Sequence, residues 1–294
     1  GKNVNIQSVN DDPSACIIDC EGSGRGFQYG NLDSGFSSID SMIRGISIIN
    51  GDAGTGYGGA IYCKSSAPEY IINCRFENNS SDVGGAIYCE NAAPIIRQCE
   101  FISNEAMFGG GIFLPSAGYV EVTNCLFLNN TASDYYGGGI GSFSSNPSIT
   151  NCTFYGNQAQ YSGGAVMHNG STGFEMTLIN CILWSNTAAV GHEIALETYT
   201  TGGIINVVNC DVMGGQAEVY VQSGAVLYWY GGNLDIDPGF VGGAPYDCHL
   251  TGASQVIDQG SDNTTLYPSI PSVDIDNDPR PQASGYDMGY DEYV

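Results

Sequence analysis

The sequence has very few basic residues. Of its 294 residues only 7 are Lys or Arg, against 31 Asp and Glu, and the formal net charge at pH 7 is −24. Nucleic acids are bound through Lys and Arg contacts to phosphate, so this charge argues against a nucleic-acid partner. The same charge disfavours tight binding of polyanionic glycans unless a cation bridges them.

Long apolar runs are also missing. No run reaches the ~18 residues that a membrane-spanning helix requires, so we expect no transmembrane segment. No signal peptide is visible, and residues 2–20 already have the character of a strand. We therefore expect the chain to be a mature form, or a fragment whose first residue lies inside the fold.

What the sequence does contain is an internal repeat. GGAIYCKSSAPEYIINCRF at residues 58–76 is followed by GGAIYCENAAPIIRQCEF at residues 84–101. Columns of residues recur in phase at intervals of roughly 25 to 29 residues. An aliphatic column comprises Ile61, Ile87, Ile112, Ile140, Val166 and Ile194. A cysteine column comprises Cys74, Cys99, Cys125, Cys152, Cys181 and Cys210, and an asparagine column comprises Asn79, Asn104, Asn130, Asn157 and Asn186.

Each repeat predicts short strands. Ile61 alternates with Cys63, and Ile72 with Cys74 and Phe76, so we expect each set to lie on one face. Gly, Pro, Asn and Ser interrupt these runs, as turns would. A unit of this size cannot bury an apolar face alone and must stack on its neighbours, and neither the Leu/Asn frame nor the helix of a leucine-rich repeat is visible. We predict an all-β, right-handed parallel β-helix with one repeat per coil and coils ~4.8 Å apart.

The columns then predict internal ladders. Stacked Ile, Cys and Phe side chains would fill the interior, and stacked asparagines would bond to one another in a buried turn. Eleven cysteines is an odd number, and we expect the column to consist of free thiols, with Cys63 and Cys89 in a shorter second ladder. Cys16, Cys20 and Cys248 are the better candidates for disulfides. No C-x2-C motif is present, which disfavours a zinc or iron–sulfur site.

The last part of the chain differs in composition. We expect coils over residues 1–232, with clear repeats over 58–212, and a C-terminal cap over 233–294. The cap carries Asp237-Pro238-x-Phe240, Ile257-Asp258-x-Gly260, Asp274-x-Asp276 with Pro279-Arg280, and Asp287-x-Gly289. These motifs resemble the choice-of-anchor Q segment of secreted bacterial and archaeal β-helix proteins. The GG-x-I and F-x-x-N coils resemble repeats of those surface proteins and of polymorphic outer-membrane proteins. The resemblance implies an exported, extracellular or surface-attached protein, and implies no chemistry.

Metal binding is one hypothesis for the acidic cap. Asp274, Asp276 and Asp278 alternate, so an extended segment would direct all three carboxylates to one side, where they suit Ca²⁺. The alternative interpretation is that Arg280 pairs with one of these aspartates and braces the cap.

Enzyme motifs are sparse. Between residues 58 and 230 the basic residues are Lys64, Arg75 and Arg97, which is little for a polysaccharide lyase, and the Gly-His-Gly of a polygalacturonase is absent. His168 and His192, with Glu193 and Glu197, form a weak candidate site. We expect no enzymatic activity and assign no catalytic residue.

Tyrosines offer a second kind of surface. Tyr62, Tyr88, Tyr136 and Tyr161, with Tyr57 and Tyr135 nearby, would form a glycan-binding face if they point outward, although β-propensity alone also explains them. The favoured function is a secreted or cell-surface protein with a structural, adhesive or filament-forming role, with self-assembly or other surface proteins as partners. The alternative is a polysaccharide-binding or polysaccharide-degrading protein.

Overall fold

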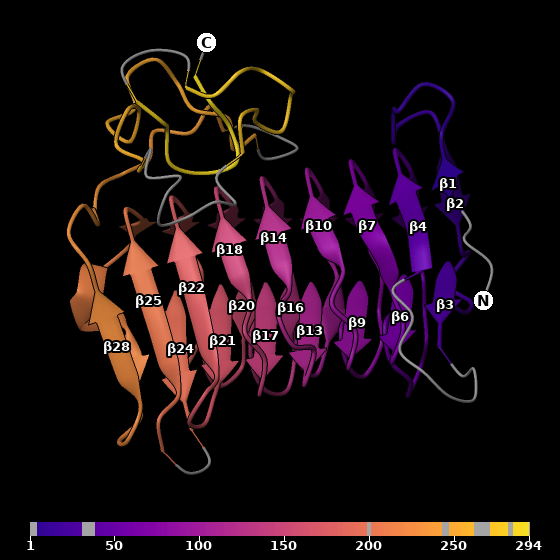
Figure 1. Cartoon of the computed structure of the whole chain (residues 1–294), viewed down its shortest axis with the longest axis horizontal. Helices are drawn as coiled ribbons and strands as arrows, with labels where there is room; N and C mark the ends of the chain where they lie inside the picture. Colours follow the sequence, from indigo (N-terminus) through magenta and orange to yellow (C-terminus); the bar gives the residue numbers. More distant parts are fainter. Residues whose placement is uncertain are drawn as a thin grey trace.

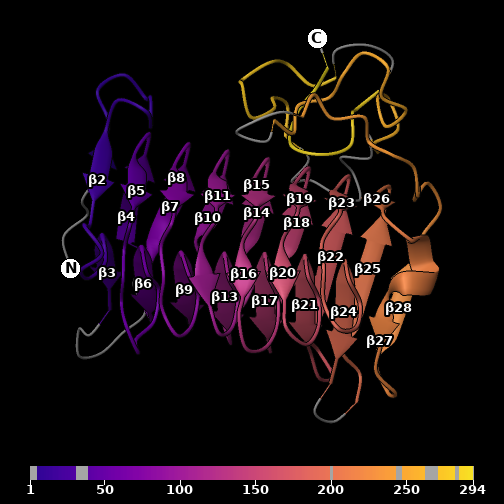
Figure 2. The ribbon, with the colours of Figure 1, turned by 180° about the vertical axis from the view of Figure 1, so that it is seen from behind.

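The chain winds into a solenoid of parallel strands, shown in the computed structural model of Figures 1 and 2. The structure describes residues 5–30, 39–198, 201–242, 247–261, 271–281 and 285–293, with side chains of residues 39 and 40 excluded. Each coil contributes one strand to each of three long sheets, named A, B and D here, and three coils add a strand to a short sheet C. The predicted fold class is confirmed.

The strands of each sheet follow one another in chain order. Sheet A contains β1 (Ile6–Gln7), β4 (Ile39–Arg44), β7 (Pro68–Ile72), β10 (Ile95–Arg97), β14 (Glu121–Thr123), β18 (Ser148–Thr150), β22 (Glu175–Ile179), β25 (Ile204–Val208) and β28 (Val226–Trp229). Sheet B contains β2 (Ile17–Asp19), β5 (Ser47–Ile49), β8 (Arg75–Glu77), β11 (Glu100–Ile102), β15 (Leu126–Leu128), β19 (Thr153–Tyr155), β23 (Ile182–Trp184) and β26 (Asp211–Val212). Sheet C contains β12 (Glu105–Ala106), β16 (Thr131–Ala132) and β20 (Gln158–Ala159). Sheet D contains β3 (Phe27–Tyr29), β6 (Ile61–Lys64), β9 (Ile87–Glu90), β13 (Ile112–Pro115), β17 (Ile140–Phe143), β21 (Val166–Asn169), β24 (Ile194–Glu197) and β27 (Tyr220–Val221), and a 3₁₀ helix, η1, spans Gly215–Glu218.

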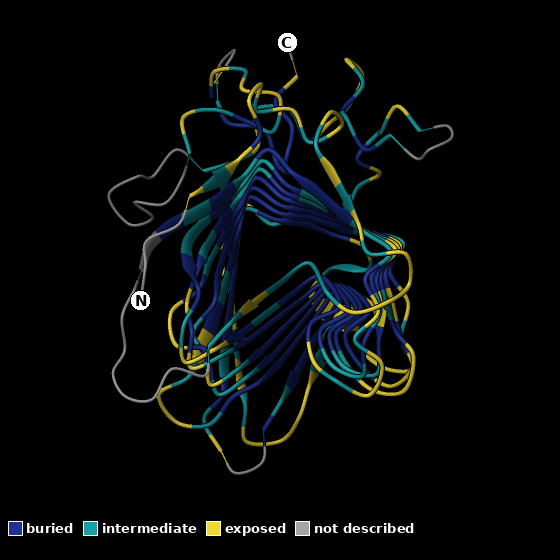
Figure 3. Ribbon diagram, turned by 90° about the vertical axis from the view of Figure 1, so that its right-hand side faces the viewer, coloured by how far each residue is buried: buried dark blue, intermediate teal, exposed yellow. Residues whose placement is uncertain are grey.

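The strands are in register with the repeat. Phe76 pairs with Phe101, which pairs with Phe127 and so on to Phe154, all in parallel. The rings stack with centroid separations of 5.0, 4.6 and 4.5 Å, close to the ~4.8 Å spacing of paired strands. The buried interior therefore consists of columns of like residues. Figure 3 shows the buried strands, in dark blue, around the axis of the solenoid.

The corners between sheets depend on residues in the left-handed backbone region. Between sheets A and B one such residue follows each sheet A strand from β7 to β25, with φ between 48° and 53°. These residues are Asn73, Gln98, Asn124, Asn151, Asn180 and Asn209. Asn tolerates this conformation better than most residues do. The GG pairs serve a further corner: Gly84 has φ 72°, and a Cβ on Gly85 would lie 2.1 Å from the Gly110 carbonyl oxygen of the next coil.

One detail of the predicted alternation is wrong. Ile71, with no exposed surface, points into the core, whereas Ile72 is half-buried on the outside. The left-handed residue Asn73 interrupts the period of two, so the inward series resumes at Cys74. The same break separates Ile96 from Cys99 in the next coil.

The described residues between 233 and 293, here called the C-terminal segment, lie against the outer face of sheet B (Figure 2). After β28 no further strand occurs among the described residues. Tyr290 and Cys248 cover Leu126 and Leu128 of β15, and Met288 with Leu250 and Val256 covers Ile182 of β23. Polar contacts attach it to the A–B corner: Asn124 Nδ2 donates to the Val273 carbonyl, and Gln98 Nε2 to that of Asp274. Because these outward residues are apolar and buried, the segment is part of the folded body.

The expected disulfides are absent. All eleven cysteines are free, including Cys16, Cys20 and Cys248. Cys16 and Cys20 flank the three-residue strand β2. At ~3.3 Å per residue the strand holds them roughly 13 Å apart, beyond the ~7 Å limit for a bridge. Cys248 is buried among Leu126, Leu128 and Tyr290. In the part of the chain that the structure describes, no helix is long and apolar enough to cross a membrane.

Candidate functional site

The asparagine column forms a continuous chain of hydrogen bonds inside the solenoid. Each Nδ2 donates to the Oδ1 of the next asparagine, at 3.0, 2.9, 2.8 and 2.8 Å from Asn79 to Asn186. Each Oδ1 also accepts the backbone N–H of the preceding member. At the start of the ladder, Asn79 Oδ1 accepts the N–H of Gly51 at 2.9 Å. The ladder therefore satisfies buried polar groups along the axis.

A carboxyl group closes this ladder, which the sequence analysis did not foresee. Glu193 Oε1 accepts the N–H of Asn186, and its Oε2 accepts Asn186 Nδ2. Burial raises the pKa of Glu193 to about 8. The sequence does indicate that the ladder needs another acceptor at this point. In the next coil Gly215 occupies the position of the asparagine column, and it has no side chain to accept the amide of Asn186.

The cysteine column is also internally satisfied. Each thiol is buried and donates to the carbonyl two residues earlier, at 3.2 or 3.3 Å. Cys63 and Cys89 pair in register in sheet D and are equally buried. Burial raises the pKa of the Cys99 thiol well above its usual range. Because all six thiols of the column are buried, they lack the solvent access that reactive cysteines need, and they act as packing groups.

The weak histidine and glutamate site is not assembled. His168 points into the core, where its Nδ1 lies 3.2 Å from Ser142 Oγ and burial lowers its pKa to about 4. His192 is exposed. Glu193 ends the asparagine ladder, and Glu197 accepts a hydrogen bond from Ser162 Oγ at 2.7 Å. The four side chains therefore do not form one site.

Aromatic side chains form a row along the outer face of sheet D. The predicted tyrosines Tyr62, Tyr88, Tyr136 and Tyr161 all lie in it. Between these tyrosines lie three phenylalanines that were not predicted from the sequence: Phe108, Phe113 and Phe143. Neighbouring centroids lie 4.2 to 6.3 Å apart, the shortest between Phe108 and Tyr135. Parallel pairing of the sheet produces the row, since Tyr62 pairs with Tyr88 and Tyr88 with Phe113.

Exposure along this row is uneven. Tyr88 is only 6% exposed, whereas Tyr57, Tyr135 and Tyr161 are 46%, 38% and 52% exposed. Burial and a hydrogen bond to Glu90 raise the pKa of Tyr88. The inner rings thus cover one another, and within this row Tyr57, Tyr135 and Tyr161 present the accessible aromatic surface.

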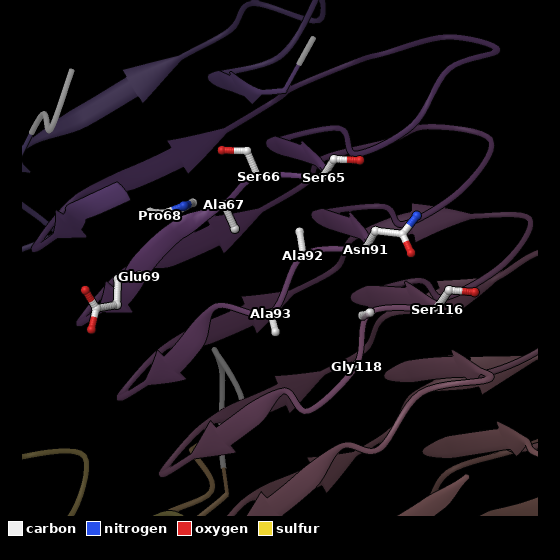
Figure 4. Close-up of a pocket in the computed structure, with 11 residues that line it drawn as sticks. Ser65, Ser66, Ala67, Pro68, Glu69, Asn91, Ala92, Ala93, Ser116 and Gly118 are labelled. Carbon is white, nitrogen blue, oxygen red and sulfur yellow. The ribbon is translucent and has the colours of Figure 1, made fainter. Parts of the chain in front are cut away.

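Two grooves cross successive coils. The first, of about 520 Å³, is lined by Thr131, Ala132, Ser133, Gln158, Ala159, Gln160, Thr187, Ala188 and Ala189. We name it the Thr–Gln groove. It adjoins the aromatic row, because Tyr161 follows Gln160 directly and its N–H donates to the Tyr135 carbonyl. The second groove, of about 540 Å³, lies between sheets D and A (Figure 4). Small residues such as Ser65, Asn91 and Ser116 line it, with Glu69 at one side.

The three predicted metal ligands do not come together. Asp274 Oδ1 accepts the N–H groups of Asp276 and Asp278 at 2.9 and 2.8 Å, and its Oδ2 accepts that of Glu292. Asp274 therefore closes a tight backbone loop. Asp276 Oδ2 instead lies 3.0 Å from His249 Nε2. Ca²⁺ binding by the three carboxylates has no support in this geometry.

Arg280 braces the C-terminal segment. It is 4% exposed, and its guanidinium donates to the carbonyls of Asp287 and Gly289 at 3.2 and 3.0 Å. Its ion-pair partner is Glu292, at 3.4 Å, where the sequence analysis had expected an aspartate. At the other end of the chain, Arg25 donates to the Gly58 carbonyl and lies over the Tyr62 ring.

Comparison with known families identifies the solenoid. The model of the right-handed β-helix region matches residues 2–141 and 84–236, which together cover most of the chain. The chain belongs to this right-handed β-helix family. No curated protein and no solved structure matched it. The β-helix fold is compatible with both structural proteins and polysaccharide-active proteins. The fold alone therefore does not determine the function, which depends on the surface of this β-helix.

Proposed function

We propose that this β-helix is an exported, non-catalytic adhesion protein that holds neutral polysaccharide chains against sheet D and the adjoining groove. The observation that carries the proposal is the aromatic row, whose accessible members Tyr135 and Tyr161 stand beside the Thr–Gln groove. Carbohydrate sites combine flat aromatic surface for the apolar faces of sugars with a few polar groups for their hydroxyls. Export is supported by the resemblance of residues 233–293 to choice-of-anchor Q segments.

The lining of the groove selects for an uncharged ligand. Thr131, Gln158 and Thr187 occupy equivalent positions in three successive coils and supply hydroxyl and amide groups. No lining residue is acidic or basic. With a net charge of −24, the protein would repel uronate polymers, whereas neutral sugars pay no such electrostatic cost.

The same lining argues against turnover. Glycoside hydrolysis needs a pair of carboxyl groups at the bond that breaks, and lyase chemistry needs a base near the substrate. The groove presents neither. The buried titratable groups His168 and Glu193 face the interior, away from any ligand on this surface.

Affinity electrophoresis in gels containing neutral or acidic polysaccharides tests the proposal. We expect retardation by at least one neutral polymer and none by polyuronates. The double variant Tyr135→Ala/Tyr161→Ala should weaken binding about tenfold or more, since a lost ring contact of this kind is worth over 1 kcal/mol. No reducing ends or unsaturated products should form during long incubation.

The matched control is Tyr228→Ala/Tyr230→Ala. These tyrosines are 48% and 46% exposed and contact each other, but they lie at the last coil, away from the row. The control should bind like the wild type. Equal loss in both double variants, or retardation by none of the neutral polymers, overturns the glycan-binding proposal. Measurable depolymerisation overturns its non-catalytic part, and concentration-dependent filaments without glycan binding would favour self-assembly.

A further inference from the structure

A second cluster of functional side chains lies in the C-terminal segment, on a different part of the molecule. His249, Asp276 and Asp291 each offer one ligand atom, and these atoms all lie within 4.8 Å of one another. The three residues come from separate stretches of chain. Asp291 is 6% exposed, while the His249 and Asp276 side chains are partly open to solvent. The cluster is therefore a converging donor set with an open side.

The imidazole is held in one orientation by a fourth residue. His249 Nδ1 lies 2.5 Å from Asp247 Oδ1, and the N–H of His249 donates to the same carboxylate oxygen. Its other nitrogen, Nε2, faces Asp276 at 3.0 Å. In metal sites the ligating histidine commonly donates its second N–H to a carboxylate, which fixes the tautomer and the ring. The carboxylate of Asp247, beside His249 Nδ1, occupies this position.

The charges around the cluster do not balance. Three carboxylates, from Asp247, Asp276 and Asp291, surround one imidazole. Arg280, the one described basic side chain of the C-terminal segment, is engaged with Glu292 and backbone carbonyls. A divalent cation would supply the missing charge.

We propose that His249 Nε2, Asp276 and Asp291 bind a Zn²⁺-like divalent transition-metal ion, with Asp247 as the positioning residue for the imidazole. One imidazole with two carboxylates is a donor set suited to Zn²⁺, whereas Ca²⁺ prefers six or more oxygens. The ion would join three stretches that no strand connects and fix them over sheet B, where the neighbouring Tyr290 and Cys248 pack on Leu126 and Leu128. This inference does not depend on glycan binding.

Metal titration of the full chain after treatment with a chelating resin tests the site. We expect one Zn²⁺ per chain, competition by Co²⁺ but not by a hundredfold excess of Ca²⁺, and visible Co²⁺ absorption bands with a nitrogen ligand. Bound Zn²⁺ should slow proteolysis of residues 233–293 and leave the coils unaffected. His249→Ala should abolish binding, and Asp247→Asn should weaken it about tenfold to a hundredfold.

Two further variants make the outcome unambiguous. Asp276→Asn changes a mostly exposed side chain, so it should leave the fold intact and still weaken binding about tenfold. His192→Ala removes an exposed histidine elsewhere and should bind like the wild type. The proposal is overturned if the wild type takes up no Zn²⁺, if Ca²⁺ displaces it at equal concentration, or if Asp276→Asn binds as tightly as the wild type. If the wild type takes up no Zn²⁺, His249 acts as an imidazolium bridge between Asp247 and Asp276.

Discussion

The coils and the C-terminal segment are stabilised in opposite ways. In the coils each contact recurs one repeat later: Phe on Phe, Asn to Asn, and thiol to the carbonyl two residues before it. In the C-terminal segment the contacts are individual, such as Arg280 with Glu292 and Asp274 with three backbone N–H groups. Repetition distributes stability along an axis, whereas the segment depends on a few buried polar groups. Substitutions in the coils should therefore have local effects, whereas a substitution in the C-terminal segment should affect the whole segment.

Replacing Arg280 by Met should give the largest effect. It removes the ion-pair partner of the buried Glu292 and the donors to the Asp287 and Gly289 carbonyls. Removing one partner of a buried ion pair costs about 3–5 kcal/mol. We expect the C-terminal segment to detach, which limited proteolysis followed by mass spectrometry would show as cleavage confined to residues 233–294. Simultaneous loss of the far-ultraviolet circular dichroism of the coils would contradict the independence of the two regions.

Asn130→Ala should have the next largest effect, and on the coils. It removes the acceptor of both the N–H and the Nδ2 of Asn104, and the donor to the Phe101 carbonyl. Leaving buried groups unpaired costs about 1–3 kcal/mol each, so we expect a loss of about 2–4 kcal/mol in the free energy of unfolding. Urea denaturation monitored by circular dichroism measures it. Gln158→Ala, an exposed change in the same part of the stack, should cost under about 0.5 kcal/mol.

The pH dependence of Glu193 is the smallest of these effects. Its folded-state pKa of about 8 exceeds the ordinary value of 4.5, so its contribution to stability is full below pH 4.5 and is lost as the pH rises through 8. Burial of Asp211 raises its pKa to about 7 and adds to the same slope. Between pH 6 and 8, Glu193→Gln should therefore lose about 1–2 kcal/mol less stability than the wild type. Glu105→Gln, an exposed change, should follow the wild-type curve, and identical slopes for all three proteins would refute the assignment.

The same contrast explains what the sequence could predict. Columns such as Phe76 to Phe154 are visible without coordinates because a parallel stack requires like residues at equal spacing. Ile72 was placed on the wrong face because a left-handed residue such as Asn73 breaks the period without a change in hydrophobicity. The sequence also indicated the tyrosines of the outer row, but it did not indicate Phe108 and Phe113, which lie in the same row.

The candidate metal cluster could not be predicted by this reasoning. His249 lies 27 residues from Asp276, and they meet only because the segment folds back on itself without repeats. Local alternation grouped Asp274, Asp276 and Asp278 instead, and it failed because Asp274 hydrogen-bonds to the backbone of the following turn. Contacts between distant residues of a non-repetitive segment produce no periodic pattern in the sequence.

Glu193 has a consequence for how such a chain can change in length. Every asparagine in the ladder donates its amide to the next residue of the series, so the ladder has a polarity and needs an acceptor at its end, which the carboxyl group of Glu193 supplies. A duplicated coil inserted between Asn79 and Asn186 would preserve the series, because it brings one acceptor and one donor. A coil duplicated beyond Glu193 would not extend the ladder, because Glu193 already accepts the last amide. Growth of the asparagine ladder by duplication is thus confined to one side of a single carboxyl group.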